Sequence, residues 1–350
     1  MKEIGGYLEF EHFKSFDFHK APKNLNVVKL NSGRSALAYL IRARGIKKIL
    51  LPYFNCDSIT KICKEYNVKM RFYNINKNFL PLNIELQDGE YFYLTNFYGQ
   101  ISLKNIEFFI EKYKNRIIID NAQAFFNEPL ENSDTIYTFR KFFGVSDGAV
   151  LYTDTVLEED LEIDKSYDKM NFLLGRFENS STEFYSDFVK NNERFETEGI
   201  KYISKLTENI LYSLNFREIE NIRTDNFKYI HSKLSSINEL DIRLVKGAFS
   251  YPLLIDNKKY KLSSENLKKE LIKRKIFIPT LWPNVLQECS EEMLEFVFAR
   301  DILPIPVDQR YNFDDMDYIF NNIKFCTFIL EYIMQHKTDK PVKLFFGLTA

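Results

Sequence analysis

The chain has 350 residues, enough for about two domains of ordinary size with a sizeable hydrophobic core. Its 48 lysines and arginines nearly balance 49 aspartates and glutamates, so the positive charge of a nucleic-acid binder is missing and no nucleic-acid partner is expected. Hydrophobic residues make up 45% and charged residues 28%, which excludes disordered and fibrous classes. No apolar run reaches the roughly 18 residues of a membrane-spanning helix, so no membrane partner is expected.

The cysteines and the first residues of the chain bear on the cellular compartment. The four cysteines are too far apart for a CxxC zinc or redox pair, so we expect no metal site and free thiols in a reducing compartment. The first residues carry charges every few positions, where a secretory signal peptide has an apolar run. These features predict a cytoplasmic protein.

Short runs of β-forming residues alternate with amphipathic stretches from Asn26 to about Thr153. Such alternation is typical of βαβ units around a parallel sheet. The predicted strands are Val27–Leu30, Lys48–Leu51, Val68–Ile75, Tyr91–Phe97, Arg116–Asp120, Thr135–Phe139 and Ala149–Thr153. The predicted helices between them are Ser35–Arg44, Asp57–Tyr66 and Ser102–Tyr113. We therefore expect an α/β fold whose large domain contains a mostly parallel seven-stranded sheet.

The rest of the chain divides into a helical connection and a smaller domain. Apolar residues recur three and four apart from about Leu157 to Phe216, which predicts a helical connection over residues 155–215. Beyond it, the predicted elements are strands at Ala248–Ile255, Ile276–Ile278 and Ile302–Pro304, a helix at Ser264–Arg274, and a terminal helix from about Asp314. We predict a large domain over residues 1–215 and a smaller C-terminal α+β domain over residues 216–350.

The segment Asn31–Leu37 directly follows a predicted strand and opens a predicted helix. Ligands of open α/β sheets gather at the carboxyl ends of strands, and the usual dinucleotide, P-loop, zinc-protease and serine-hydrolase motifs are missing from the sequence. Gly33 lets the backbone approach an anion, and the free N–H groups of Arg34 and Ser35 favour it. The side chains of Arg34 and Ser35 can add donors. The alternative is an ordinary capped turn with a solvated Arg34.

Asp120 ends the apolar strand that contains Ile117–Ile119. A carboxylate at the rim of a dry sheet is costly unless it meets a cation, a metal ion or hydrogen-bond donors. The sequence therefore indicates either an acid that contacts a ligand or a helix cap.

Thr138–Lys141 follows another predicted strand, and large apolar residues flank Lys141. Desolvation lowers the pKa of a lysine in such a setting, as an amine that forms an imine requires. The alternative is that Arg140 and Lys141 are exposed loop charges. The chain thus has an anion-binding helix start, then the acid Asp120, and then a lysine 21 residues later. This is the order in which a fold-type-I protein holds pyridoxal 5′-phosphate (PLP).

The same segments resemble motifs of the DegT/StrS-type sugar aminotransferase family. The family's Ser-Gly-Thr-x-Ala-Leu is similar to Ser32–Leu37, its Asp-x-Ala-Gln matches Asp120–Gln123, and its Ser-Phe-x-x-x-Lys resembles Thr138–Lys141. Further similar segments are Pro52–Asn55, Asn96–Gly99, Asp147–Ala149 and the tail Leu303–Asp308. The resemblance covers residues 26–155 well and residues 245–325 loosely.

This resemblance implies PLP as the cofactor and Lys141 and Asp120 as catalytic residues. It gives Lys141 the covalent bond to the cofactor and the proton transfer, Asp120 the pyridine nitrogen, and Gln123 the side of the ring hydroxyl. The implied cofactor-binding set is Gly33, Arg34, Ser35, Phe54, Asn96, Asp120, Gln123, Thr138 and Lys141.

The sequence also departs from the family pattern. Thr138 and Lys141 are two residues closer together than in the family, and Arg34 stands where a small hydroxyl residue is usual. The aromatic residue that normally covers the pyridine ring falls at Cys56, so Tyr53, Phe54 or Asn96 would have to cover it. No segment resembles the family's Asn-x-Arg, which reaches the phosphate of a neighbouring subunit.

The resemblance implies an enzyme that moves an amino group, from glutamate, onto a nucleotide-linked keto sugar for polysaccharide biosynthesis. It also implies a cytoplasmic homodimer. Two alternatives remain open, because a fold does not fix a reaction. One is another PLP reaction on the same scaffold, such as that of a decarboxylase, a lyase or a sugar dehydratase. The other is a cofactor-free binding protein derived from the family.

Overall fold

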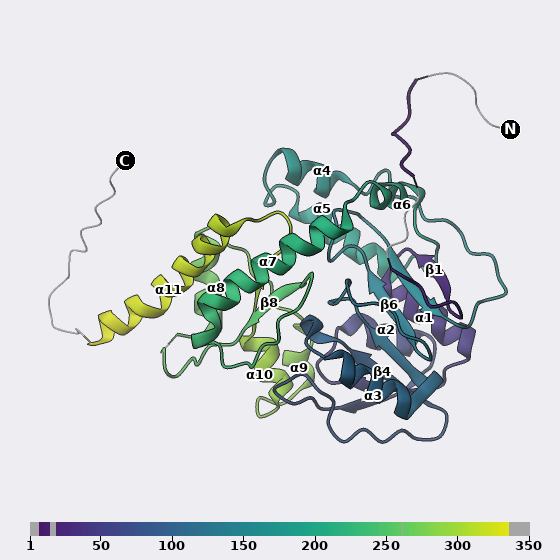
Figure 1. The fold of residues 1–350 in the computed structure, drawn as a ribbon, viewed down its shortest axis with the longest axis horizontal. Helices are drawn as coiled ribbons and strands as arrows, with labels where there is room; N and C mark the ends of the chain where they lie inside the picture. Colours follow the sequence, from purple (N-terminus) through teal and green to yellow (C-terminus); the bar gives the residue numbers. More distant parts are fainter. Residues whose placement is uncertain (1–6, 15–18, 261, 336–350) are drawn as a thin grey trace.

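The computed structural model describes residues 7–14, 19–260 and 262–335 (Figure 1). The seven-stranded sheet predicted from the sequence is present, in the order β1-β7-β6-β5-β4-β2-β3. Its strands are β1 (Asn26–Leu30), β2 (Lys48–Pro52), β3 (Lys69–Tyr73), β4 (Glu90–Thr95), β5 (Ile117–Asp120), β6 (Asp134–Thr138) and β7 (Ala149–Thr153). Strands β2 to β6 run parallel, and β7 runs antiparallel between β6 and β1. The expectation of a mostly parallel sheet is confirmed.

Helices cover both faces of this sheet. Alternate residues of each strand point to opposite faces, and both faces carry apolar side chains that must be buried. On one face, Ile118 packs in a cluster with apolar residues of α1 (Gly33–Arg44) and α2 (Asp57–Glu65). On the other face, Ile117 and Ile119 pack with α3 (Leu103–Tyr113) and with residues of the C-terminal part. The sheet is therefore buried on both sides.

The C-terminal part contains a two-stranded antiparallel sheet, β8 (Ser250–Leu253) and β9 (Leu303–Pro306). Its helices are α7 (Phe216–Leu234), α8 (Ser264–Lys273), α9 (Val285–Glu288), α10 (Leu294–Asp301) and α11 (Phe313–Gln335). In Figure 1 these helices lie to the left of the large sheet, apart from α7, which crosses toward it. The predicted smaller α+β part is present; residues 336–350 of the predicted domain lie outside the described residues.

The strand predicted at Ile276–Ile278 is wrong. Ile276 and Ile278 are buried and Phe277 between them is exposed, so the alternating pattern is real. No described strand pairs with this segment, and a strand needs a hydrogen-bonded neighbour. The alternation of apolar residues here therefore reflects which side chains are buried, although the segment forms no strand.

The middle of the chain is helical only in part. Its helices are α4 (Asn171–Glu178), α5 (Tyr185–Glu193) and α6 (Lys205–Tyr212), and residues 157–170 form none. Single turns of 3-10 helix complete the fold: η1 (Phe97–Gly99), η2 (Lys114–Arg116), η3 (Arg194–Glu196) and η4 (Ser235–Ile237). The domain boundary at residues 215 and 216 stays a prediction, and α7 begins there.

The four cysteines are unpaired, as expected. Within the described ranges, no helix combines the length and the apolar character needed to cross a membrane.

His19 lies in an aromatic environment beside the sheet. Its Nε2 lies 2.5 Å from the carbonyl oxygen of Phe125, and its Nδ1 lies 3.1 Å from the hydroxyl of Tyr152. Its ring also packs against Tyr137, 4.4 Å between centres. Burial lowers the pKa of His19 from 6.5 to about 4, although the Phe125 carbonyl opposes the shift.

We expect His19 to make the protein less stable in mild acid. Between pH 6.5 and about 4 the unfolded chain binds a proton at His19 that the folded chain does not, so stability falls as the pH falls through this window. A shift of this size corresponds to about 3 kcal/mol at most. Urea unfolding of wild type and His19→Gln at several pH values measures it. The slope should flatten in His19→Gln but not in His12→Gln, which changes an exposed histidine; equal slopes in all three proteins would contradict the prediction.

Candidate functional site

The register of the sheet brings the predicted site residues to one edge. Thr95 at the end of β4 pairs with Asp120 at the end of β5, and Asp120 pairs with Ile136 of β6. Thr138 at the end of β6 pairs with Ala149, which in turn pairs with Leu30 at the end of β1. The segment that starts α1 therefore leaves the sheet beside Thr138.

The start of α1 packs closely against Thr138. Ser32 caps the helix, and its Oγ accepts a hydrogen bond from the N–H of Ser35 at 3.1 Å. A Cβ added to Gly33 would lie 2.8 Å from Cγ2 of Thr138, so only glycine permits this contact. Ser35 is buried and its Oγ donates to the carbonyl oxygen of Gly199 at 3.2 Å. Gly33, Ser35 and Thr138 are thus brought together, and the hydroxyl of Ser35 is already engaged.

Asp120 is held by two donors. The hydroxyl of Tyr93 donates to Asp120 Oδ2 at 3.1 Å, and the N–H of Ala122 donates to Asp120 Oδ1 at 2.9 Å. Burial, and then the nearby Asp120 carboxylate, raise the pKa of Tyr93 well above its usual range, so its hydroxyl stays a donor. The residues after Asp120 form turns, so the alternative of a helix cap is wrong.

Gln123 and Asn96 follow the ends of β5 and β4. Gln123 Oε1 accepts from the N–H of Tyr98 at 2.8 Å, while Gln123 Nε2 is buried without a partner among the described residues. Asn96 is fully buried: its Nδ2 donates to Asn121 Oδ1 at 3.0 Å and its Oδ1 accepts from the N–H of Ile101 at 3.1 Å. Gln123 has a free donor for a ligand, whereas both amide atoms of Asn96 are engaged by the protein.

Four side-chain atoms at or shortly after the C-terminal ends of β2, β4, β5 and β6 are buried and have no hydrogen-bond partner among the described residues. They are Asn55 Nδ2, Thr95 Oγ1, Gln123 Nε2 and Thr138 Oγ1. Buried polar atoms are nearly always hydrogen-bonded, so a cluster of exceptions calls for a partner that the chain itself does not supply. This edge of the sheet is therefore suited to a polar ligand.

The candidates for covering a cofactor ring lie elsewhere in the packing. Phe54 is 1% exposed, and its ring contacts Trp282 at 4.4 Å and Phe97 at 5.2 Å between centres. Tyr53 stacks on Phe72 at 5.2 Å. Phe54 and Asn96 are thus interior residues, and their role toward a ring stays a prediction.

Lys141 differs from its neighbour Arg140. Lys141 is exposed, and its Nζ lies 6.0 Å from the ring centre of Phe249, so the expected desolvated setting is wrong. Arg140 is partly buried, donates to Asn192 Oδ1, and lies 4.7 Å from the ring centre of Phe195. Burial, followed by repulsion from two neighbouring arginines, lowers the pKa of Arg140 to about 10. The alternative of exposed loop charges thus holds for Lys141 only.

The packing of the following phenylalanines explains this exposure. Phe142 and Phe143 are buried, and the carbonyl oxygen of Phe142 accepts from Arg223 at 3.0 Å and from Gln309 at 2.8 Å. Lys141 directly precedes these two buried rings, and its own side chain is exposed. The C-terminal part therefore fixes the shape of the lysine loop.

Asp147, the acid six residues after Lys141, has a structural role. It is fully buried, and its carboxylate accepts from the N–H and the Oγ of Ser204, each at 2.8 Å, at the start of α6. Gly148 follows with a φ of 113°, and an added Cβ would lie 2.8 Å from Phe139. This acid-glycine pair anchors α6 to the sheet.

Solved structures with similar folds include sugar aminotransferases. S. venezuelae DesV, in complex with a ketimine intermediate, is 15% identical with a TM-score of 0.60, covering 86% of this chain and 84% of that chain. DesI, with its TDP-sugar product, is 11% identical with a TM-score of 0.62, covering 89% and 83%. Spr1654 of Streptococcus pneumoniae, in its PLP form, is 11% identical with a TM-score of 0.59, covering 87% of each chain. No protein-family model and no curated protein matches the sequence.

The chain has the same overall fold as these solved structures. The resemblance seen in the sequence motifs is confirmed at the level of the fold, over most of the chain. At this distance the comparison establishes architecture, while the chemistry depends on the site residues.

Some residues at this edge of the sheet were not predicted as site residues. Tyr93 and Thr95 lie within a predicted strand, and only their alternation toward its end marks them. Arg140 lies beside Lys141 in the same motif, and nothing in the sequence distinguishes it from an exposed arginine. Arg194, described below, belongs to the helical middle, where no sequence motif marks it.

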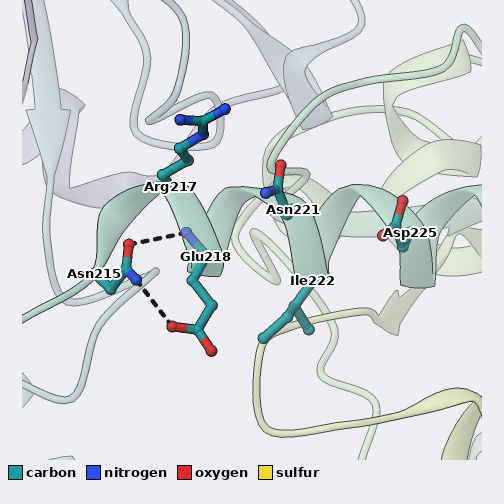
Figure 2. A pocket seen from close by; sticks show the side chains of 6 residues that line it. All are labelled: Asn215, Arg217, Glu218, Asn221, Ile222 and Asp225. Atoms are coloured by element: carbon teal, nitrogen blue, oxygen red, sulfur yellow. Dashed lines mark hydrogen bonds between the residues drawn. The ribbon is translucent and has the colours of Figure 1, made fainter.

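A separate cavity of about 280 Å³ lies along the first half of α7, lined by Asn215, Arg217, Glu218, Asn221, Ile222 and Asp225 (Figure 2). Asn215 and Glu218 form a helix-capping pair there: Asn215 Oδ1 accepts from the N–H of Glu218 at 3.2 Å, and Asn215 Nδ2 donates to its carboxylate at 3.0 Å. None of these residues is a predicted site residue. Across the described ranges, no group of three His, Cys, Asp or Glu side chains is placed to hold a metal ion.

Proposed function

We propose that the protein is a PLP-dependent aminotransferase that acts on a sugar. The observation that carries the proposal is the set of buried, unpartnered polar atoms at the C-terminal ends of the neighbouring strands β2, β4, β5 and β6, where Asp120 also lies. The comparisons support the proposal, because structures with the same fold include sugar aminotransferases, and one of these was solved in a PLP form.

The residues present fit this cofactor. The first N–H groups of α1 and Thr138 Oγ1 would hold its phosphate, since both are donors at one place and Thr138 Oγ1 has no described partner. Gln123 Nε2 is a free donor for the ring hydroxyl, and Asp120 is a carboxylate for the pyridine nitrogen. When bound, PLP supplies an electron sink that stabilises a carbanion next to nitrogen.

The chain's own residues would carry the remaining steps. Tyr93 and the N–H of Ala122 fix the Asp120 carboxylate, so that its charge would keep a proton on the pyridine nitrogen of a bound cofactor. No described hydrogen bond or ion pair holds Lys141, so its side chain is able to turn toward the edge of the sheet. There its amine would accept a proton from the amino donor and return it to the product.

The finer parts of the proposal rest on the resemblance and on the neighbours. DesI was solved with a TDP-sugar product, which supports a nucleotide-linked keto sugar as the amino acceptor. Glutamate as the amino donor, a role in polysaccharide biosynthesis and a homodimer follow from the family resemblance alone. The four unpaired cysteines support the cytoplasm as the compartment. Light scattering on the purified chain measures the number of subunits.

The proposal is tested by trapping the cofactor. We expect the purified protein incubated with PLP to absorb visible light, and borohydride reduction to attach the cofactor irreversibly to Lys141, because this lysine is the only amine in the loop after β6. Peptide mass spectrometry locates the modified residue. Labelling of another lysine would reassign the catalytic amine, and no labelling together with no visible band would refute the proposed function.

A second candidate is favoured by the exposed position of Lys141. A cofactor-binding protein whose lysine stays over Phe249 would perform a PLP reaction without that amine, or would bind a ligand without chemistry. Retention of bound PLP without borohydride labelling would support this candidate.

A further inference from the structure

Three arginine side chains gather beside the start of α1. Arg34 Nη1 donates to the carbonyl oxygen of Asn192 at 3.0 Å, and Arg140 donates to the side-chain oxygen of the same residue. The guanidinium groups of Arg140 and Arg194 lie 4.7 and 4.1 Å from the ring centre of Phe195. Contacts with Asn192 and Phe195 therefore bring three cations from distant parts of the chain close to one another.

Of these three cations, Arg194 forms ion pairs with acids of the described chain. Arg194 pairs with Asp164 at 2.9 Å and with Glu198 at 2.5 Å. In the part of the chain that the structure describes, neither Arg34 nor Arg140 forms an ion pair; both donate to uncharged oxygens of Asn192. A partly buried cation that lacks a counter-ion is costly unless an anion joins it.

The carboxylates that act on these two arginines are engaged elsewhere. Asp57, which feels the charge of Arg34, pairs with Lys61 at 2.8 Å. Asp147, which attracts Arg140, is held by the hydrogen bonds at the start of α6. Among the residues that the structure describes, neither of these two acids is therefore free to pair with Arg34 or Arg140.

Unused donors lie around the same place. Thr138 Oγ1 is buried without a described partner, and Thr138 contacts Gly33 in the first turn of α1. Arg194 is 8% exposed in its side chain, and its Nη2 also lacks a described partner. A phosphate monoester dianion carries three oxygens that accept several charge-assisted hydrogen bonds, which matches this set of donors.

We propose that Arg140, together with Arg34, binds the phosphate group of a phosphorylated ligand at the start of α1, with Lys141 outside the site. That the ligand is PLP rests on the proposed function, whereas the anion site follows from the arginines themselves. In the loop after β6, the side chain of Arg140 is partly buried and that of Lys141 is exposed.

The experiment uses the full chain and inorganic phosphate as the probe. Isothermal titration measures the phosphate dissociation constant, and thermal unfolding gives Tm with and without phosphate. The variants are Arg140→Gln, which removes the inner charge and keeps an amide for Asn192, and Lys141→Gln, the matched control that removes the adjacent exposed charge. Arg140→Lys tests whether charge alone restores binding.

We expect Arg140→Gln to weaken phosphate binding about 10- to 100-fold, the effect of losing one charge-assisted hydrogen bond. Lys141→Gln should bind within about twofold of wild type, and Arg140→Lys should fall between the two. Without phosphate, the Tm of Arg140→Gln should equal or exceed that of wild type, because repulsion among the arginines is relieved. Phosphate should raise the Tm of wild type more than that of this variant.

Equal phosphate affinity in wild type and Arg140→Gln, or no phosphate binding by the wild type, would overturn the inference. A Tm loss in Arg140→Gln that is the same with and without phosphate would assign Arg140 a merely structural role, which also overturns it. The failure of the proposed function has a different signature: phosphate binding that depends on Arg140 persists, but borohydride attaches PLP to no lysine.

Discussion

Arg44→Met is expected to lower the free energy of unfolding by about 3–5 kcal/mol, the cost of removing one partner from a buried ion pair. Arg44 Nε and Nη2 donate to the two carboxylate oxygens of Asp134 at 2.6 and 2.8 Å, and Nη2 also contacts Asp154. Asp134 is 1% exposed in its side chain. In the variant, Thr153 Oγ1 at 2.6 Å would be its remaining described side-chain donor.

The same helix supplies a matched control. Arg42 pairs with Glu159 on the surface, with side chains 37% and 42% exposed, so Arg42→Met should cost less than about 1 kcal/mol. Adding Asp134→Asn to Arg44→Met should recover part of the loss, because the buried charge is removed along with its partner. Urea unfolding measures all four proteins. Equal losses in Arg42→Met and Arg44→Met would show that the buried pair contributes no more than the surface pair.

Lys141→Ala is expected to lower the rate of the amino-donor half-reaction by about 100- to 10,000-fold, the usual contribution of a positioned acid-base group. The reason is that Lys141 is the amine in the loop after β6 and is the residue proposed to move the proton. Stopped-flow absorbance of the PLP-loaded protein mixed with glutamate measures this rate.

Two further variants test whether the effect comes from the amine of Lys141, from its positive charge, or from the loss of any lysine in this region. Lys141→Arg should be as slow as Lys141→Ala, since an arginine stays protonated at working pH. Lys246→Ala changes another exposed lysine, three residues before Phe249, and should react like wild type. A normal rate in Lys141→Ala, or a loss in Lys246→Ala, would move the role away from Lys141.

The sheet and part of its edge were predictable because local sequence determines them. Runs such as Ile117–Ile119 are apolar on both faces, and only a strand buried on both sides requires that. Asp120 and Gln123 follow such a run directly, so their place at the edge follows from the end of the strand. Gly33 follows β1 in the same way.

The position of Lys141 was not predictable, because distant residues decide it. Arg223 on α7 and Gln309 after β9 both donate to the carbonyl oxygen of Phe142, and nothing near Lys141 in the sequence announces them. The cluster of Arg34, Arg140 and Arg194 likewise depends on α5 returning to the start of α1. Such long-range packing leaves no periodic trace in the sequence.

The core on the α3 face of the sheet has a consequence for how the chain folds during synthesis. Phe92, Ile117 and Ile119 belong to one apolar cluster with Leu267, Phe298 and Ile305, far along the chain. While the ribosome extends the chain, α3 covers part of this face of the sheet, and the rest stays uncovered until α8, α10 and β9 have emerged. Transiently exposed hydrophobic surface of this kind promotes aggregation. We therefore expect the nascent protein to depend on shielding of this surface until its C-terminal part has been made.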